Sequence, residues 1–220
     1  MKIAILGGTG REGAALALRW AASGEDVIIG SRDENRAVAA ADDQNRALGK
    51  TTIRGASNRQ AAEEADVVVL TVPATAHLAI LAEVREALQG KLLIDATVSL
   101  DPDAPGRLSS PNHRSAIEEA QEFLGPRTNV VAAFQNISHR LLREPNRRID
   151  CDVLVCGDDP QSRQLAMALV EKTGLRALDA GAAHFARTVE ALTPLLLELN
   201  RRYKAKEAGI RITGLPEKER

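Results

Sequence analysis

The sequence has 220 residues, of which 44% are hydrophobic, 27% are charged and only 2% are aromatic. This length suits one large α/β domain, or one nucleotide-binding domain with a small appended lobe, and it is short for two equal domains. The formal net charge is −1 and like charges form no block, which argues against a nucleic-acid partner and against a membrane surface.

Apolar runs are short throughout the chain. Runs such as 67–70 and 78–82 fall far below the roughly 20 residues that a membrane span requires. The sequence starts on a predicted strand, which leaves no room for a signal peptide, so we expect a cytoplasmic protein. Two cysteines and four scattered histidines show no metal-ligand spacing, and no metal site is expected.

Short β-branched runs alternate with Ala- and Leu-rich amphipathic segments, the pattern of a parallel sheet with crossover helices. Strands are predicted near 2–6, 26–30, 51–55, 66–71, 91–95, 128–133, 152–156 and 174–178. Helices are predicted near 12–23, 33–48, 58–64, 76–88, 111–124, 160–172 and 184–206. The sequence therefore predicts an α/β, Rossmann-type doubly wound parallel sheet, with a nucleotide-binding domain over 1–150 and a small C-terminal α/β lobe over 151–220 that ends in a long helix.

Several helix boundaries carry local signals. Ser110-Pro111 and Asp159-Pro160 each place a capping side chain before a proline at the first helical position. The stretch 97–111 is predicted to be a long loop at the carboxyl edge of the sheet, either a lid over a ligand or an exposed connection. Residues 217–220 are expected to fray.

The first strand is followed by a glycine-rich turn that opens an Ala- and Leu-rich helix. In this context Gly8 allows a tight turn, Gly10 allows the backbone to approach a pyrophosphate, and Gly13 lets the helix pack on the strand. The helix N-terminus then supplies N–H donors to the diphosphate. The predicted phosphate-binding residues are Gly8, Thr9, Gly10, Arg11, Glu12 and Gly13.

The second strand ends in Ser31-Arg32, where an enzyme that uses NAD would place an acidic residue for the ribose 2′-hydroxyl. Arg32 can bind a 2′-phosphate with its planar guanidinium, Ser31 can donate a hydrogen bond, and Arg36 adds charge one helical turn later. Asp33, at the start of the helix, is predicted to cap it. These residues favour NADP(H) over NAD.

Thr71, Val72 and Pro73 follow the fourth strand, where a dinucleotide would pass over the sheet edge towards its nicotinamide. Catalysis of carbonyl reduction needs a positioned acid, and the sequence has no Tyr-x-x-x-Lys pair. His77 is predicted to start a helix rather than to donate a proton, and no catalytic residue is assigned. Hydride exchange between two flat redox cofactors requires alignment more than acid catalysis.

Six short motifs spread over nearly the whole chain carry a family resemblance. They are LGGTG at 6–10, GSR at 30–32, VLTVP at 69–73, CGDD at 156–159, LDAG at 178–181 and VEALTPL at 189–195. With these motifs the sequence resembles the coenzyme F420-dependent NADP oxidoreductases, which exchange hydride between NADP and a reduced 8-hydroxy-5-deazaflavin.

The resemblance implies a deazaflavin in the cleft between the Rossmann domain and the C-terminal lobe, against Gln135, Asn136 and Ile137. It also implies that Thr9, Ser31, Arg32 and Arg36 hold the 2′-phosphate of NADP, and that Val72-Pro73 backs the nicotinamide. Archaeal members look like His-Thr-Ile-Pro where this chain has Gln-Asn-Ile-Ser at 135–138. Gln135 can still hydrogen-bond a ring carbonyl but does not titrate near neutral pH.

Several alternatives stay open at this point. In the alternative interpretation, Gln135 and Asn136 bind no ligand and form hydrogen bonds only with nearby backbone groups. The chain can be a reductase of an ordinary flavin, an imine or a small ketone, or a non-catalytic NADP-sensing module. The final helix carries leucines at spacings of three and four, and such an apolar helix on a small protein favours a homodimer.

Overall fold

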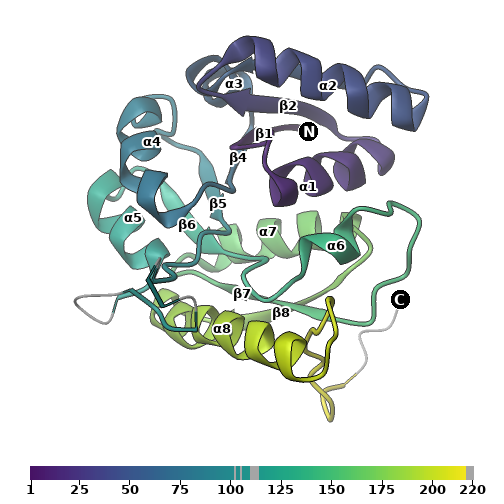
Figure 1. The fold of residues 1–220 in the computed structure, drawn as a ribbon. Coiled ribbons are helices and arrows are strands. Elements are labelled where there is room, and N and C mark those ends of the chain that lie inside the picture. The colour runs from purple at the N-terminus through teal and green to yellow at the C-terminus, as the bar shows by residue number, and fades with distance from the viewer. Residues whose placement is uncertain (102, 105, 110–113, 217–220) are drawn as a thin grey trace.

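The computed structural model describes residues 1–101, 103–104, 106–109 and 114–216, and Figure 1 shows its strands and helices. The strands are β1 (Lys2–Leu6), β2 (Asp26–Ser31), β3 (Ile53–Ser57), β4 (Val67–Leu70), β5 (Leu92–Asp95), β6 (Asn129–Ala132), β7 (Asp152–Cys156) and β8 (Arg176–Gly181). The α-helices are α1 (Arg11–Ala22), α2 (Glu34–Leu48), α3 (Asn58–Glu64), α4 (His77–Val84), α5 (Ala116–Leu124), α6 (His139–Leu142), α7 (Pro160–Lys172) and α8 (Ala186–Arg202). Short 3-10 helices, η1 (Ala74–Ala76) and η2 (Ala183–Phe185), precede α4 and α8.

All eight strands lie in one sheet, in the order β3-β2-β1-β4-β5-β6-β7-β8. Pairing is parallel from β3 to β6 and again between β7 and β8, which confirms the predicted Rossmann-type α/β fold. β7 continues the sheet beyond β6, and the predicted division into domains at residue 150 stays a prediction.

The pair β6–β7 is antiparallel, which the sequence did not predict. Between these strands the chain forms only the four-residue helix α6, which is too short to cross the sheet and return the chain to the amino edge. The two strands pair through Ala132 and Cys156, the last residues of each. β7 therefore enters from beyond the carboxyl edge of β6, and the segment between them stays at that edge.

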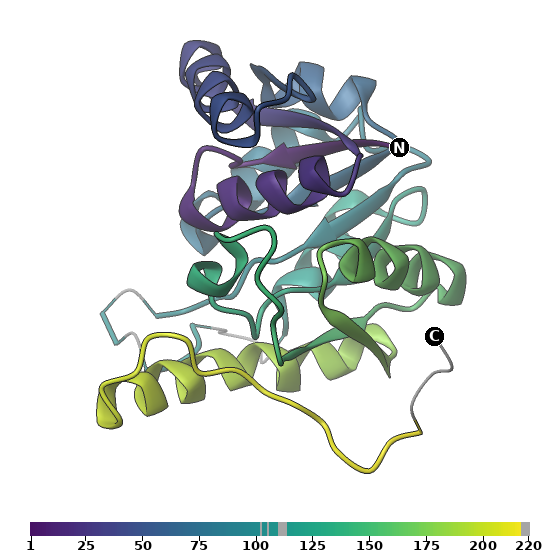
Figure 2. The same cartoon turned by 90° about the vertical axis from the view of Figure 1, so that its right-hand side faces the viewer.

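Two apolar clusters cover the two faces of the sheet. One joins the sheet to α1, α2, α6 and α7, and the other joins it to α3, α4, α5 and the start of α8. β4 and β5 are buried along their whole length, as expected for strands covered on both faces. Figures 1 and 2 show α8 running beside β7 and β8, away from the β1–β3 end of the molecule.

Arg19 fixes the connection that follows α6. Its guanidinium is buried, 2% exposed, and donates to five carbonyls: those of Leu141, Leu142, Glu144, Arg147 and Thr173. Such a buried cation is stabilised only when its donors are all used in this way. The contact anchors the segment after β6 to α1.

The helices differ from the prediction at several points. The helix predicted from residue 111 begins at Ala116, where Ser115 and Glu118 form a capping box. The helix α6 was missed because four residues are too few to show a period. The last helix ends at Arg202 rather than at 206, and Lys204 follows with a φ of +51°.

Other local predictions were confirmed or fall outside the described residues. Asp159 caps α7, accepting from the backbone N–H of Ser162 at 2.7 Å. The Ser110-Pro111 cap, part of the 97–111 loop and residues 217–220 lie outside the described residues. Within the part of the chain that the structure describes, no helix has both the length and the apolar character needed to cross a membrane.

Candidate functional site

The turn between β1 and α1, where the sequence predicts a phosphate loop, is tight and depends on its glycines. Gly7 has a φ of +79°, and the amides of Gly8 and Gly10 donate to Ile5 and Gly7 carbonyls at 3.1 and 2.8 Å. A Cβ on Gly13 would lie 2.5 Å from Thr71 Oγ1 and 2.9 Å from the Gly7 carbonyl oxygen. Only glycine fits there, and its absence of a side chain lets α1 begin directly against the turn. The first amides of α1 point along the carboxyl edge of the sheet.

The end of β2 places a cationic corner beside this loop. Arg32 and Arg36 are exposed and form no ion pair among the described residues. Asp33 caps α2, accepting from the Arg36 backbone N–H at 3.3 Å, so the predicted capping role of Asp33 is confirmed. The adjacent acid is thus engaged with the helix, which leaves both guanidinium groups for an anion.

Thr71 and Val72, after β4, pack against the turn between β1 and α1. The Thr71 hydroxyl donates to the Leu6 carbonyl at 3.1 Å, and a Cβ on Gly7 would lie 2.8 Å from Val72 Cγ1. Pro73 follows with extended backbone and leads into η1. Contact between these residues and a nicotinamide stays a prediction.

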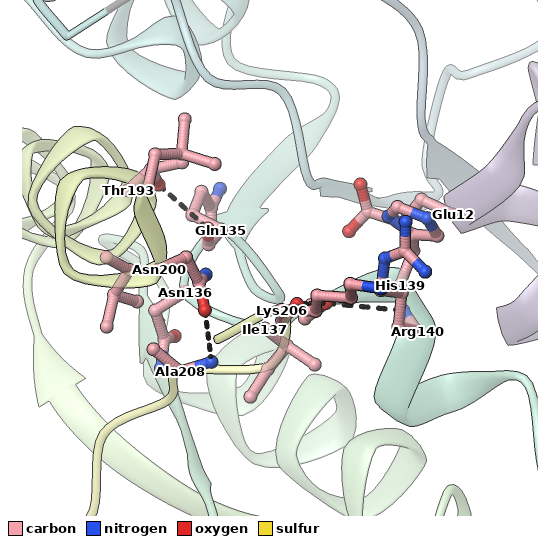
Figure 3. A pocket seen from close by; sticks show the side chains of 13 residues that line it. Glu12, Gln135, Asn136, Ile137, His139, Arg140, Thr193, Asn200, Lys206 and Ala208 are labelled. Carbon is pink, nitrogen blue, oxygen red and sulfur yellow. Dashed lines mark hydrogen bonds between the residues drawn. The ribbon is translucent and has the colours of Figure 1, made fainter. Parts of the chain in front are cut away.

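A cavity of about 300 Å³ lies where α1, α6, α8 and the segment after α8 meet (Figure 3). Its lining comprises Glu12, Gln135, Asn136, Ile137, Ser138, His139, Arg140, Thr193, Leu196, Leu197, Asn200, Lys206 and Ala208. The structure thus brings Gln135, Asn136 and Ile137, the residues predicted to face a second ring, to the same cavity as Glu12 of the phosphate loop. Such a volume is at the lower end of the range for small-molecule sites.

The polar wall of the cavity is set by a sharp turn after β6. Phe134 is fully buried with a φ of +77°, a conformation that costs energy for a residue with a side chain. Beyond it, Gln135 Nε2 donates to the Asp95 carbonyl and Asn136 Nδ2 donates to the Asp152 carbonyl, each at 2.7 Å. Thr193 Oγ1 of α8 donates to the Gln135 carbonyl at 2.8 Å.

These contacts engage only the NH2 group of each side-chain amide of Gln135 and Asn136. As the alternative interpretation held, both side-chain NH2 groups satisfy backbone carbonyls. The oxygens Gln135 Oε1 and Asn136 Oδ1, however, are buried and accept no hydrogen bond among the described residues. A buried acceptor without a donor is costly, so a ligand that supplies N–H or O–H groups would be stabilised here.

Charged groups sit on the α1–α6 side of the cavity, opposite Thr193 and Gln135 (Figure 3). Burial raises the pKa of the Glu12 carboxyl to about 8. Burial and the nearby Arg11, Arg140 and Arg143 lower the pKa of His139 below its usual range. At neutral pH the site therefore holds a protonated carboxyl beside a neutral imidazole.

Comparison with known proteins places the chain in a family. An F420-dependent NADP reductase of Methanothermobacter marburgensis is 47% identical over 99% of this chain and 100% of its own length. A model of the family described as NADP oxidoreductase, coenzyme F420-dependent, matches residues 2–99. The chain belongs to the F420-dependent NADP reductase family.

Solved structures agree with this membership of the F420-dependent NADP reductase family. A candidate F420-dependent NADP reductase from Arthrobacter sp. FB24 has a TM-score of 0.84 at 28% identity, covering 97% of this chain and 100% of that chain. An imine reductase of Streptomyces aurantiacus has a TM-score of 0.61 at 17% identity, covering 93% of this chain and 64% of that one. The second likeness shows the shared fold alone.

A buried charge cluster lies behind the cavity and was not recognised in the sequence. His77, at the start of α4 as predicted, has Nε2 2.6 Å from Asp95 Oδ2, and both side chains are buried. Burial opposes a charge on His77, yet the hydrogen bond and charge of Asp95 raise its pKa overall. Glu190 of α8 accepts from the Ala116 N–H at 2.7 Å, and burial raises its pKa to about 8.

Sequence reasoning also missed His139, Thr193, Asn200 and Lys206, which line the cavity. Thr193 lies inside the VEALTPL motif, so a signal for it was present but carried no role. Asn200 Oδ1 accepts from the Ala208 N–H at 3.0 Å, which folds the segment after α8 over the cavity. No local pattern marks Lys206, because its place depends on that return.

Proposed function

We propose that this chain transfers hydride between NADP(H) and coenzyme F420, the 8-hydroxy-5-deazaflavin that gives the family its name. The observation that carries the proposal is a polar-walled cavity whose lining includes Glu12, a residue of the predicted phosphate loop in the first turn of α1. A deazaflavin bound there supplies a ring carbon that accepts or gives up a hydride.

NADP fits the other half of the site. We assign the diphosphate to the turn of Gly8, Thr9, Gly10, Arg11, Glu12 and Gly13, where the glycines let the backbone come close and the amides of the first turn of α1 donate. We assign the 2′-phosphate to Ser31, Arg32 and Arg36, because neither guanidinium has another anionic partner among the described residues. Thr71, Val72 and Pro73 then lie on the path towards the nicotinamide.

The acceptor oxygens of the cavity that have no donor among the described residues match the N–H groups on one edge of a deazaflavin. Gln135 Oε1 and Asn136 Oδ1 need donors, and the uracil-like end of such a ring offers N–H groups. Ile137 and Leu196 provide the apolar surface against which a flat ring can pack. The hydrogen bonds of Gln135, Asn136 and Thr193 fix the backbone and side chains around this surface.

One contribution of the protein to the reaction is the placement of the two rings. The glycine turn, the start of α1 and the end of β2 bind the nucleotide, and the cavity holds the second ring against it. Alignment of the reacting carbons at about 3–3.5 Å converts an encounter of two ligands into a unimolecular step. Burial of the polar wall excludes water, which would otherwise compete for the free acceptors.

The test is the absorbance of each acceptor mixed with protein and NADPH. The proposal predicts that deazaflavin absorbance is lost while FMN and a cyclic imine react at least tenfold more slowly. Faster bleaching of the flavin, or faster turnover of the imine, would assign the site to that acceptor instead. No oxidation of NADPH with any acceptor would favour a sensing module.

We further propose a cytoplasmic homodimer. The support is α8, where Leu195 is 53% exposed, with Tyr203 beyond it at 77%. Apolar side chains gathered on one helix are typical of subunit interfaces. Light scattering at micromolar concentration should give twice the chain mass, and Leu195→Glu should give the monomer. Cell fractionation tests the location.

A further inference from the structure

We propose that Glu12 is a catalytic residue that exchanges the proton accompanying hydride transfer in the cavity. This inference rests on the proposed function, because a proton must move whenever the second ring changes its redox state. The net reaction is NADPH + oxidised deazaflavin + H⁺ → NADP⁺ + reduced deazaflavin. Hydride supplies one hydrogen with two electrons, and the remaining proton must come from a group in the site or from water.

Position is the first argument. Glu12 is in the first turn of α1, two residues after Gly10, and its side chain lies on the α1–α6 side of the cavity, across from Gln135 and Thr193 (Figure 3). The residue therefore belongs to both halves of the site. A ring that packs against Gln135–Ile137 and faces the nucleotide would pass directly beside this carboxyl.

The chemistry of the other lining residues is the second argument. Gln135, Asn136, Thr193 and Asn200 are neutral groups that do not titrate near neutral pH. α8 thus presents no titratable group to the cavity. Glu12 is the one carboxyl in the lining as the described residues define it.

The charges that face Glu12 come from α6 and from the segment after α8. They are His139, Arg140 and Lys206, and the last two are exposed at the edge of the cavity. The cations Arg140 and Lys206 favour the carboxylate, whereas burial disfavours it, and burial dominates, raising the pKa of Glu12 to about 8. His139 is shifted the opposite way and is neutral at pH 7.

Binding of the nucleotide further favours the protonated form of Glu12. The diphosphate assigned to the start of α1 brings negative charge next to Glu12, and a like charge further disfavours the carboxylate. With NADPH bound, Glu12 holds its proton at neutral pH. During reduction the O–H bond of Glu12 breaks, its electron pair stays on the carboxylate, and the proton forms an N–H bond on the ring. Water then returns a proton to Glu12.

The first experiment needs no turnover. Among the described residues the Glu12 side chain forms no hydrogen bond or ion pair, so Glu12→Gln should fold like the wild type. Calorimetry of NADP⁺ binding at pH 8, in two buffers of different ionisation enthalpy, measures proton uptake. At this pH a 2′-phosphate with a pKa of about 6 is already ionised. We expect uptake of up to about half a proton by the wild type and none by Glu12→Gln.

The second experiment follows deazaflavin reduction by NADPH between pH 6 and 10. The wild-type kcat should fall above the pKa of Glu12, while Glu12→Gln should lose about 100-fold at pH 7 and show no such step. The control is Glu64→Gln, at the far end of α3 beside the amino edge of the sheet, which should match the wild type. His139→Gln should keep the step.

The outcomes separate this inference from the proposed function. Equal proton uptake in wild type and Glu12→Gln, or a step that vanishes only in His139→Gln, would overturn the role of Glu12 while leaving deazaflavin reduction intact. Failure of the wild type to bleach the deazaflavin at any pH would overturn the proposed function itself.

Discussion

The two halves of the site are built in different ways. The proposed nucleotide half uses mainly one continuous stretch, from β1 through the glycine turn and β2 to Arg36 in the first turn of α2, and Thr71, Val72 and Pro73 join it from after β4. Its polar groups are backbone amides and exposed arginines. The acceptor half joins side chains from residues 12, 135–140, 193–200 and 206–208. Its geometry depends on buried hydrogen bonds between distant segments, such as Thr193 to Gln135. Local changes should therefore damage the first half, and distant changes the second.

The largest effect is expected from Gly13→Val. Any Cβ at this position meets backbone atoms of Gly7 and Gly8 within 2.9 Å, so α1 must move away from the turn. Affinity for NADPH, measured by fluorescence titration, should fall at least about 100-fold. Gly106→Ala is the control, because a Cβ there meets nothing within 4 Å. An unchanged affinity would mean that this turn does not bind the diphosphate.

Arg32→Ala comes next. Loss of a charge-assisted contact with the 2′-phosphate costs about 2 kcal/mol, or about 30-fold in the Michaelis constant for NADPH, with kcat at saturation little changed. NADH, which lacks that phosphate, should be used as before. Arg46→Ala, at the other end of α2 and paired with Asp43, should leave both constants unchanged. An unaltered constant for NADPH in Arg32→Ala would rule this assignment out.

The buried cluster of His77, Asp95 and Glu190 behind the cavity should make the stability of the fold depend on pH through Glu190. The folded-state pKa of about 8 lies above the ordinary value of 4.5, so the stabilisation is present below pH 4.5 and is lost as pH rises towards 8. Glu190→Gln keeps an acceptor for the Ala116 N–H without this charge. In urea unfolding, the free energy of unfolding of the wild type should fall by about 4 kcal/mol more than that of the variant between pH 5 and 8.5, because about three pKa units at about 1.4 kcal/mol each lie in that range.

His77 adds to that loss in both proteins. Its pKa is raised in the folded state, so its contribution also disappears as pH rises. NADPH affinity should not follow either change, since neither group lies in the nucleotide half. Identical pH dependence of unfolding in wild type and Glu190→Gln would remove Glu190 from the account.

The two halves of the site also differ in how well the sequence alone predicts them. The strands and the glycine turn could be predicted because their periods and φ requirements are local. The antiparallel entry of β7 could not, because it depends on the missing crossover between β6 and β7. Glu12 was assigned to the phosphate loop by its position, but its exposure to the cavity depends on α6 and α8 packing opposite it.

The smallest effect is expected from Thr193→Val. The variant keeps the shape of the side chain but removes the donor to the Gln135 carbonyl, a loss of about 1 kcal/mol. The Michaelis constant for the deazaflavin should rise about fivefold and that for NADPH should stay constant. Thr188→Val, exposed on the same helix, is the matched control. A rise in the NADPH constant alone would show that α8 contacts the nucleotide instead.

The central claim is that hydride passes directly between the two rings in one water-excluded site. It is tested by supplying NADPH deuterated at C4 of the nicotinamide, in each stereochemical form, and analysing the reduced deazaflavin by mass spectrometry. We predict that one form transfers its deuterium completely to the deazaflavin and the other transfers none. Deuterium lost to solvent, or equal transfer from both forms, would contradict it.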